Sequence, residues 1–544
     1  MRRGLTRRWS WRRAGSAIPG ALGHDRSLDW RFLLPPGDGR PFGVLRLLAG
    51  DPCVAGRVAG LGLARETVTT SDDDRPVDAL IALGGRPDAV LRAARTVRPG
   101  GVLYCHVDRL DRRTLRWSPR RYREALQALG FDTAVYWRRR QAGKDTLFVP
   151  VDFAAPGPWF VEEAMGDRRP ARRMVRTVLR LLMRGDGRHL ALLAGRYAVV
   201  GVARTSSQHP AGSAALTPAV VLTDQDQPRP SIVLARGEGA WSRVVFLVFD
   251  PQGEQPSLVV KVPRKPEHNY ATEREHRTLA TLGDLLQGDD LAATVPRSLG
   301  VRYWAGLAVG TETFVPGRPL AFGSRADGHD DTARLHRAVG WLIDLHRATR
   351  AGEVDLSSAD AALLDERLLD VMGLHGLARS RVQRLLLPET APPATVPLVW
   401  QHCDLTPRNM RWDGFRHSVV DWEAARVGPA LCDLLYLLLH WSWPGGVPFG
   451  SAPQRVFDEV FAITGNEPAE RAQRQVRRYC DALGVAPHLV PVLLAAMLGQ
   501  QALDRVERIS DSGGDPVQDD NVYAALLQSV LARGEPVPAW STSW

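Results

Sequence analysis

Lysine is the scarcest charged residue in this 544-residue chain. Three lysines stand among 70 basic residues, and they are Lys144, Lys261 and Lys265. The arginines that supply the rest of the net charge of +10 are spread along the chain, and they do not form a recognised nucleic-acid-binding motif. We therefore expect no specific nucleic-acid partner.

Closely spaced cysteines and long apolar runs are also lacking. The five cysteines form no CxxC pair and no spacing typical of a disulfide framework or a zinc site. They are Cys53, Cys105, Cys403, Cys432 and Cys480. No apolar run reaches the length that spans a bilayer, and the arginine-rich N-terminus is not followed by the apolar core of a secretory signal. We expect a cytoplasmic protein without a transmembrane segment.

The chain is too long for one hydrophobic core. Its patterning predicts a multidomain protein, α/β in the N-terminal part and α+β in the C-terminal part. The predicted units are a basic extension (1–25), an α/β domain (26–152), a linker (153–229), a β-rich N-lobe (230–316) and a helical C-lobe (317–544). Within the linker, the pattern of residues 171–184 predicts a basic amphipathic helix, either with a solvated basic face or in weak contact with an anionic surface.

Polar residues that suit phosphoryl transfer follow two apolar strands between residues 397 and 439. The first strand delivers His402, with Asp404 two residues later and Asn409 five residues beyond it. The second delivers Asp421. Phosphoryl transfer needs a carboxylate at the acceptor hydroxyl, and an amide and a second carboxylate on the metal that neutralises the phosphates.

The segments HCDLTPRN and VVDWEAARVGPALCDLL resemble the catalytic and metal-binding loops of the aminoglycoside phosphotransferase and choline kinase group, which has a protein-kinase-like fold. The resemblance implies that Asp404 is the catalytic carboxylate, that His402 orients its loop, and that Asn409 and Asp421 are metal ligands. It also implies ATP and Mg²⁺ as cofactors. The acceptor would be a hydroxyl of a small molecule, such as a sugar, an amino alcohol or an antibiotic-like metabolite. Cys403 stands where the family has a glycine.

Upstream residues fit the nucleotide-binding side of such a fold. Lys261 ends the strand SLVVK, and Glu275 lies on one helical face with Leu279 and Leu282. We predict that Lys261 pairs with Glu275, with Glu273 as the alternative. The remaining predicted nucleotide contacts are the phosphate turn, with Gly237, Gly239 and Ser242, and the adenine-binding backbone of residues 312–315, which includes Glu312 and Phe314.

The N-terminal α/β segment VDALIALGGRPDAVLRAARTVRPGGVLYCHV resembles the middle of class I S-adenosylmethionine-dependent methyltransferases, which have a Rossmann-like sheet. Its cofactor loop departs from that family: Arg46 stands in place of an acid, and Leu48 and Pro52 in place of glycines. We do not expect S-adenosylmethionine to bind. Two alternatives to a small-molecule kinase stay open: a bifunctional methyltransferase and kinase, and an inactive nucleotide-binding scaffold.

Overall fold

The computed structural model describes most of the chain that carries the predicted elements. The described residues are 26–35, 41–49, 52–70, 74–84, 86–108, 117–141, 144–151, 156–157, 159–160, 196–205, 218, 229–235, 242–320, 331–356, 395–442, 453–511 and 521–533. The predicted helix at 171–184, and with it the predicted surface contact, lies outside them, as do Gly237 and Gly239.

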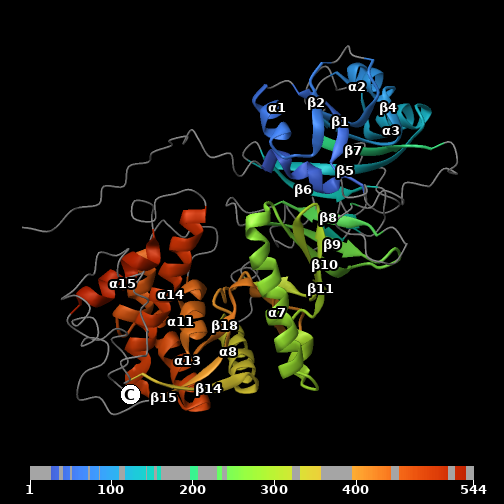
Figure 1. Ribbon diagram of the computed structural model, residues 1–544. Helices are drawn as coiled ribbons and strands as arrows, with labels where there is room; N and C mark the ends of the chain where they lie inside the picture. Colours follow the sequence, from blue (N-terminus) through green and yellow to red (C-terminus); the bar gives the residue numbers. More distant parts are fainter. Residues whose placement is uncertain are drawn as a thin grey trace, which may run out of the picture.

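A 12-stranded sheet runs through the N-terminal half and into the following lobe, in the order β11-β12-β10-β9-β8-β6-β5-β7-β4-β3-β1-β2. Its strands are β1 (Phe42–Ala49), β2 (Ala64–Val68), β3 (Val77–Leu83), β4 (Val97–Asp108), β5 (Phe131–Gln141), β6 (Lys144–Pro150), β7 (Arg196–Ala203), β8 (Ser231–Leu234), β9 (Arg243–Phe249), β10 (Pro256–Pro263), β11 (Ser298–Trp304) and β12 (Leu307–Thr313). Figure 1 shows the sheet continuing from the blue N-terminal strands to the green ones.

The α/β pattern of the N-terminal part is present in the first four strands. β1 pairs in parallel with β2 and β3, and β3 pairs in parallel with β4. The helices of this part are α1 (Pro52–Ala59), α2 (Pro87–Ala94) and α3 (Pro119–Ala128), and a 3₁₀ helix, η1 (Arg26–Leu33), precedes β1. The apolar face of α2 and of α3 packs on the sheet, which explains their amphipathic sequences.

The structure has a strand of eight residues, β7, within the segment that we predicted to be a linker. β7 lies between β4 and β5 and pairs antiparallel with both. Most of its side chains are buried. The sequence RYAVVGVA is a nearly continuous apolar run, the pattern of a strand covered on both faces. The linker prediction is therefore wrong for β7, because position along the chain does not show that a later strand inserts into an earlier sheet.

The two predicted domains share this sheet. β6 pairs antiparallel with β8 through Leu147 with Leu234 and Phe148 with Val233. One buried cluster includes residues from both sides of that junction, such as Tyr104 and Phe246. The N-terminal strands and the β-rich lobe are consequently one packed body.

The C-terminal lobe is mostly helical, as predicted. Its helices are α8 (Asp331–Ala348), α11 (Cys432–Trp441), α12 (Pro453–Phe457), α13 (Glu467–Leu483), α14 (Val490–Asp511) and α15 (Val522–Ala532), and α7 (Asn269–Leu285) belongs to the β-rich lobe. Two small sheets accompany them, formed by β13 (Arg318–Pro319), β16 (Met410–Trp412) and β17 (His417–Val419), and by β14 (Arg350–Asp355), β15 (Thr395–Gln401) and β18 (Arg426–Pro429). Figure 1 shows these helices gathered beside α7 and away from the N-terminal strands.

We expected no apolar segment long enough to span a bilayer, but one described helix has that length and composition. Residues Pro487–Ser510 are long and apolar enough to cross a membrane by length and composition, but 72% of their most apolar window is buried inside the fold. α14 contacts α11 and α15, and its apolar residues belong to the core of the lobe. Burial in that core accounts for its composition without a bilayer.

Candidate functional site

The first turn of α11 fixes the backbone of the loop that follows β15. The backbone N–H groups of His402 and Cys403 donate to the two carboxylate oxygens of Asp433, at 2.6 and 2.9 Å. Asp433 is fully buried, and its pKa is lowered because, although burial opposes ionisation, these donors and His346 stabilise the carboxylate. The loop therefore starts from a fixed backbone.

His402 connects this loop to the strand that leads to Asp421. Its Nδ1 accepts from the backbone N–H of Asp404 at 3.2 Å, and its Nε2 faces the carbonyl of Val420 at 3.0 Å. Since Nδ1 accepts, Nε2 carries the proton that is donated to Val420. The buried imidazole thus has a defined tautomer and joins the two loops, which agrees with an orienting role.

Asp404 is half-buried at the mouth of the loop. Its carboxylate accepts from the hydroxyl of Tyr436 and from Nδ2 of Asn409, both at 3.2 Å. Nδ2 of Asn409 also donates to the Asp404 carbonyl at 2.9 Å. Burial raises the pKa of Asp404, which makes its carboxylate a better proton acceptor than an ordinary aspartate.

Asp421 lies at the end of the second strand in a left-handed backbone conformation, with φ of 75°. Lys261 lies beside it, with Nζ 3.7 Å from its Oδ1. Asp and Asn are the non-glycine residues that tolerate this conformation best. The turn therefore suits an aspartate, and it directs the chain into η7 (Trp422–Ala424).

The structure brings Lys261 and Glu275 together. Nζ of Lys261 donates to Oε1 of Glu275 at 2.6 Å, and the same carboxylate oxygen accepts from the backbone N–H of Trp422 at 3.0 Å. Glu273 lies elsewhere and accepts from the hydroxyl of Tyr303. Glu275 thus ties the lysine of β10 to the residue after Asp421.

Arg243, which sequence reasoning missed, is the second cation of this cluster. Its guanidinium pairs with Glu275, with Asp421 at 2.8 Å and with Glu423 at 2.8 Å. Arg243 is the first residue of β9, and an arginine at a strand end usually reads as a solvated charge. No sequence signal marked it, because its three partners come from segments distant in the chain.

Four carboxylates surround the two cations, and the pKa values of three of them are shifted in different directions. Burial opposes ionisation of Glu275, yet Arg243 and Lys261 together hold its pKa well below the usual range. Burial raises the pKa of Glu312 to about 7 despite Lys261 at 3.0 Å. Burial also raises the pKa of Glu423. The cluster therefore contains more carboxylates than cations.

The predicted adenine contacts at Glu312 and Phe314 stay a prediction, and both residues already have contacts within the lobe. Glu312 is paired within the sheet with Val259, and its side chain is directed to Lys261. The backbone N–H of Phe314 donates to the carbonyl of Ser257 at 3.0 Å. The Glu312 side chain and the Phe314 N–H are therefore engaged within the lobe, and the prediction concerns the remaining backbone groups of residues 312–315.

Ser242 is buried at the end of the predicted phosphate turn. Its carbonyl accepts from Nη1 of Arg264 at 2.6 Å. Its hydroxyl has no hydrogen-bond partner among the described residues. The backbone of Ser242 is thus held in place by Arg264.

In the N-terminal sheet, Arg46 does not lie where the sequence comparison suggested. Its guanidinium donates to the hydroxyl of Thr96 and to the carbonyl of Arg75, at 2.7 and 3.0 Å. Arg75 precedes β3 and Thr96 precedes β4. The guanidinium of Arg46 therefore lies at the amino ends of these parallel strands. Ligands of open α/β sheets bind at the carboxyl ends. Arg46 therefore does not obstruct a cofactor, and that part of the argument against S-adenosylmethionine is wrong.

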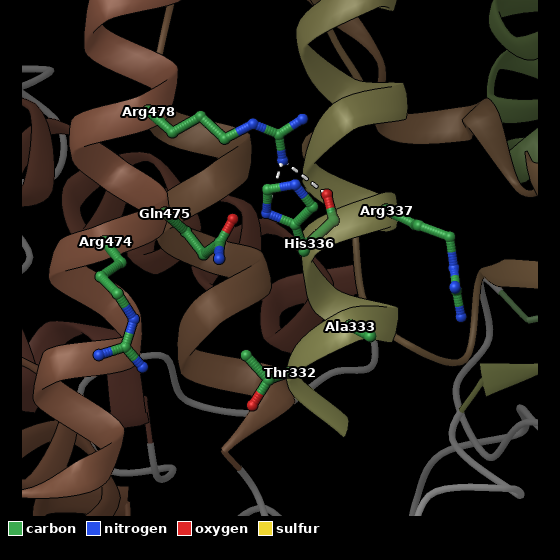
Figure 2. Close-up of a pocket in the computed structure, with 7 residues that line it drawn as sticks. All are labelled: Thr332, Ala333, His336, Arg337, Arg474, Gln475 and Arg478. Carbon is green, nitrogen blue, oxygen red and sulfur yellow. Dashed lines mark hydrogen bonds between the residues drawn. The ribbon is translucent and has the colours of Figure 1, made fainter. Parts of the chain in front are cut away.

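A cavity of about 450 Å³ lies apart from these residues, between α8 and α13. Figure 2 shows Arg474 and Arg478 on one wall and His336 on the other. Arg478 donates to the carbonyl of His336 at 2.7 Å and contacts its ring at 3.2 Å. This arginine therefore joins the two helices.

A lysine–glutamate pair under a β-rich lobe, facing two loops from a helical lobe, defines a kinase-like fold with mixed α and β content. Residues 233–488 match the phosphotransferase enzyme family, APH. The C-terminal half of the chain therefore contains a region that matches that family, as predicted.

Several solved kinases are similar to this chain at low identity. They are a choline/ethanolamine kinase family protein from Mesorhizobium loti (17% identity, 54% of this chain, 86% of that chain, TM-score 0.32), aminoglycoside phosphotransferase APH(3'')-Id from Streptomyces rimosus (15%, 47%, 89%, 0.29) and choline kinase from Cryptosporidium parvum (13%, 56%, 88%, 0.30). TM-scores this low do not by themselves establish a common fold. No protein of curated function matches the chain, and the family match begins at residue 233 and so does not include its N-terminal part.

Proposed function

We propose that this protein transfers the γ-phosphoryl group of Mg²⁺-bound ATP to a hydroxyl of a small molecule. The observation that carries the proposal is the contact of Lys261 with both Glu275 and Asp421, at 2.6 and 3.7 Å. It unites a strand, a helix and a loop from different parts of the chain. Such a lysine on the third strand of the lobe, fixed by a helix glutamate, is the arrangement that holds ATP phosphates in kinases.

We assign to Asp404 the role of binding the acceptor hydroxyl. Its carboxylate is oriented by Tyr436 and Asn409, and its raised pKa favours proton acceptance. In this role Asp404 orients the acceptor hydroxyl and takes its proton as the oxygen attacks phosphorus. In this account His402 and Asp433 act by holding the loop that carries Asp404.

The residues present fit a hard divalent cation that is also bound by phosphate oxygens. Asp421 supplies a carboxylate and Asn409 an amide oxygen, which are ligands that Mg²⁺ prefers. Among the described residues no group of three or more His, Cys, Asp or Glu side chains is arranged to hold a metal. Mg²⁺ usually takes one or two protein carboxylates plus phosphates, so its binding should depend on nucleotide. When bound, it neutralises the charge of the phosphates.

Screening hydroxylated metabolites for acceptor-dependent release of ADP tests the proposal. Choline, ethanolamine and aminoglycosides are suitable first probes, because solved kinases that match this chain at low identity are named for these acceptors. Asp404→Asn is the control that should lose turnover. Failure of every acceptor, together with failure to bind ATP, would remove the proposal.

For the N-terminal sheet we propose a structural role in place of methyl transfer. It continues the sheet of the β-rich lobe through β6 and β8, and Leu48 and Pro52 occupy positions where backbone would have to approach a cofactor. A bifunctional enzyme remains the alternative, and measurable binding of S-adenosylmethionine would favour it.

A further inference from the structure

The 3₁₀ helix η1 lies where the N-terminal sheet meets the β-rich lobe. Trp30 stacks on Tyr104 of β4, with ring centroids 5.1 Å apart, and Phe32 packs against Trp304 of β11 at 6.3 Å. Both side chains of η1 are buried. The helix therefore contacts strands from both halves of the 12-stranded sheet.

η1 also carries a buried carboxylate that pairs with the β-rich lobe. Asp29 is fully buried, and it accepts from Nε and Nη2 of Arg264 at distances from 2.8 to 3.2 Å. Arg264 follows β10, the strand that carries Lys261. The carbonyl of Arg264 accepts in turn from Nη2 of Arg31 at 2.7 Å. The fork of this arginine is thereby fixed by the N-terminal helix.

The remaining arm of the fork reaches the nucleotide side. Nη1 of Arg264 donates to the carbonyl of Ser242 at 2.6 Å. Ser242 directly precedes Arg243, whose guanidinium contacts Asp421 and Glu423. A chain of short polar contacts thus runs from Asp29 through Arg264 to the start of β9.

We propose that Asp29 and Arg264 are positioning residues for the nucleotide site. Asp29 orients the guanidinium of Arg264, and Arg264 holds Ser242 and Arg243 in register with Lys261 and Asp421. This inference rests on the proposed kinase function. Its consequence is that the N-terminal helix is part of the nucleotide-binding lobe, although it lies more than 200 residues upstream in the chain.

A planar arginine is required here and a lysine would not serve. Arginine donates in several directions from one rigid fork, whereas the ammonium of lysine is a compact point charge. Arg264→Lys keeps a positive charge beside Asp29 and so avoids a lone buried carboxylate. It removes the contact with Ser242, which makes it the sharpest variant.

The experiment measures binding of a non-hydrolysable ATP analogue with Mg²⁺ by calorimetry on the full chain, with the melting temperature of each variant recorded beside it. Arg264→Lys and Asp29→Asn should each weaken binding on the order of tenfold, the scale of losses caused by residues that orient a site. The double variant should be no weaker than Arg264→Lys alone, since both residues act through one contact.

Asp132→Asn is the matched control. It breaks the pair of Asp132 with Arg204 at 2.9 Å, which lies within the N-terminal sheet. It should leave the dissociation constant unchanged whatever its effect on the melting temperature. A purely structural role of Asp29 would make its variant behave in the same way.

The two proposals fail in different ways. If the wild-type chain binds nucleotide and folded Arg264→Lys binds it equally well, the positioning role is overturned and the kinase proposal stands. If the wild-type chain binds no nucleotide, both are overturned. Should Asp29→Asn fail to fold, Arg264→Lys decides alone, because its buried pair is retained.

Discussion

Nη2 of Arg243 lies 2.8 Å from Oδ1 of Asp421. The carboxylate that we assign to the metal therefore already has a cationic partner. The same guanidinium pairs with Glu275 and Glu423. It therefore neutralises negative charge that Lys261 would otherwise have to neutralise alone.

Arg243→Gln should destabilise the fold and make its stability depend on divalent cations. Removing one partner of a buried ion pair typically costs about 3–5 kcal/mol, and we expect the melting temperature to fall accordingly. Millimolar Mg²⁺ should recover more of the melting temperature in this variant than in the wild type, because the freed carboxylates attract a cation.

Arg196→Gln provides the comparison for this measurement. It breaks a partly exposed pair with Asp108, and pairs of that kind contribute about 1 kcal/mol or less. If Arg243→Gln melts like Arg196→Gln and responds no more to Mg²⁺, the charge balance described for the cluster is wrong.

Asp404→Asn should lower turnover by roughly a hundredfold or more, the size of general-base effects, while ATP affinity stays similar. The amide oxygen of the introduced asparagine can still accept from Nδ2 of Asn409, as the Asp404 carboxylate does, so the arrangement on the nucleotide side is retained. Steady-state kinetics with the identified acceptor measures the first quantity and calorimetry with ATP the second. Equal turnover would exclude Asp404 from the chemistry.

The same variant has a pH signature. The pKa of Asp404 is raised in the folded protein, so this group disfavours folding once the pH exceeds its unfolded pKa. Asp404→Asn should therefore be more stable than wild type at neutral pH. The difference should disappear as the pH falls below the unfolded pKa, near 4, where both states bind the proton. Chemical denaturation at several pH values measures this difference, and a difference of the opposite sign would contradict the prediction.

Cys403 adopts φ of 62°, a conformation that favours glycine, the residue of the family at this position. Cys403→Gly relieves the strain but loses a buried side chain, so we expect the free energy of unfolding to change by less than about 1 kcal/mol. Cys403→Val should lower it by about 2 kcal/mol or more, because a β-branched residue is disfavoured there. Cys105→Val, in a buried strand with ordinary φ, should cost less, and equal costs would argue against backbone strain.

S-adenosylmethionine should give no measurable heat when titrated into the full chain. The reason is now steric alone, since Leu48 and Pro52 stand in place of glycines and Arg46 is bound at the other end of the strands. A micromolar dissociation constant would favour the bifunctional alternative.

The sequence predicted the parts of the site that depend on local spacing. His402, Asp404, Asn409 and Asp421 are close in sequence, and the helical period selected Glu275 over Glu273. What the sequence did not predict depends on contacts between distant segments. Arg243 gains its role from three remote carboxylates.

The same limit applies to the fold. The strand sequences were recognisable, but nothing local indicates that β7 inserts between β4 and β5 or that β6 pairs with β8. An apolar strand sequence indicates that the strand is buried, but it does not show which strands lie beside it. The separation into two domains was for that reason too simple.

Thermal unfolding of the full chain with ATP, in the presence and absence of Mg²⁺, tests the central claim most directly. Asp421 and Asn409 offer few metal ligands without phosphates, so the account predicts a small shift with ATP alone and a clearly larger one with ATP and Mg²⁺ together. Lys261→Met should abolish most of the larger shift. A melting temperature that is unchanged by ATP and Mg²⁺ would contradict the assignment of this protein as a kinase.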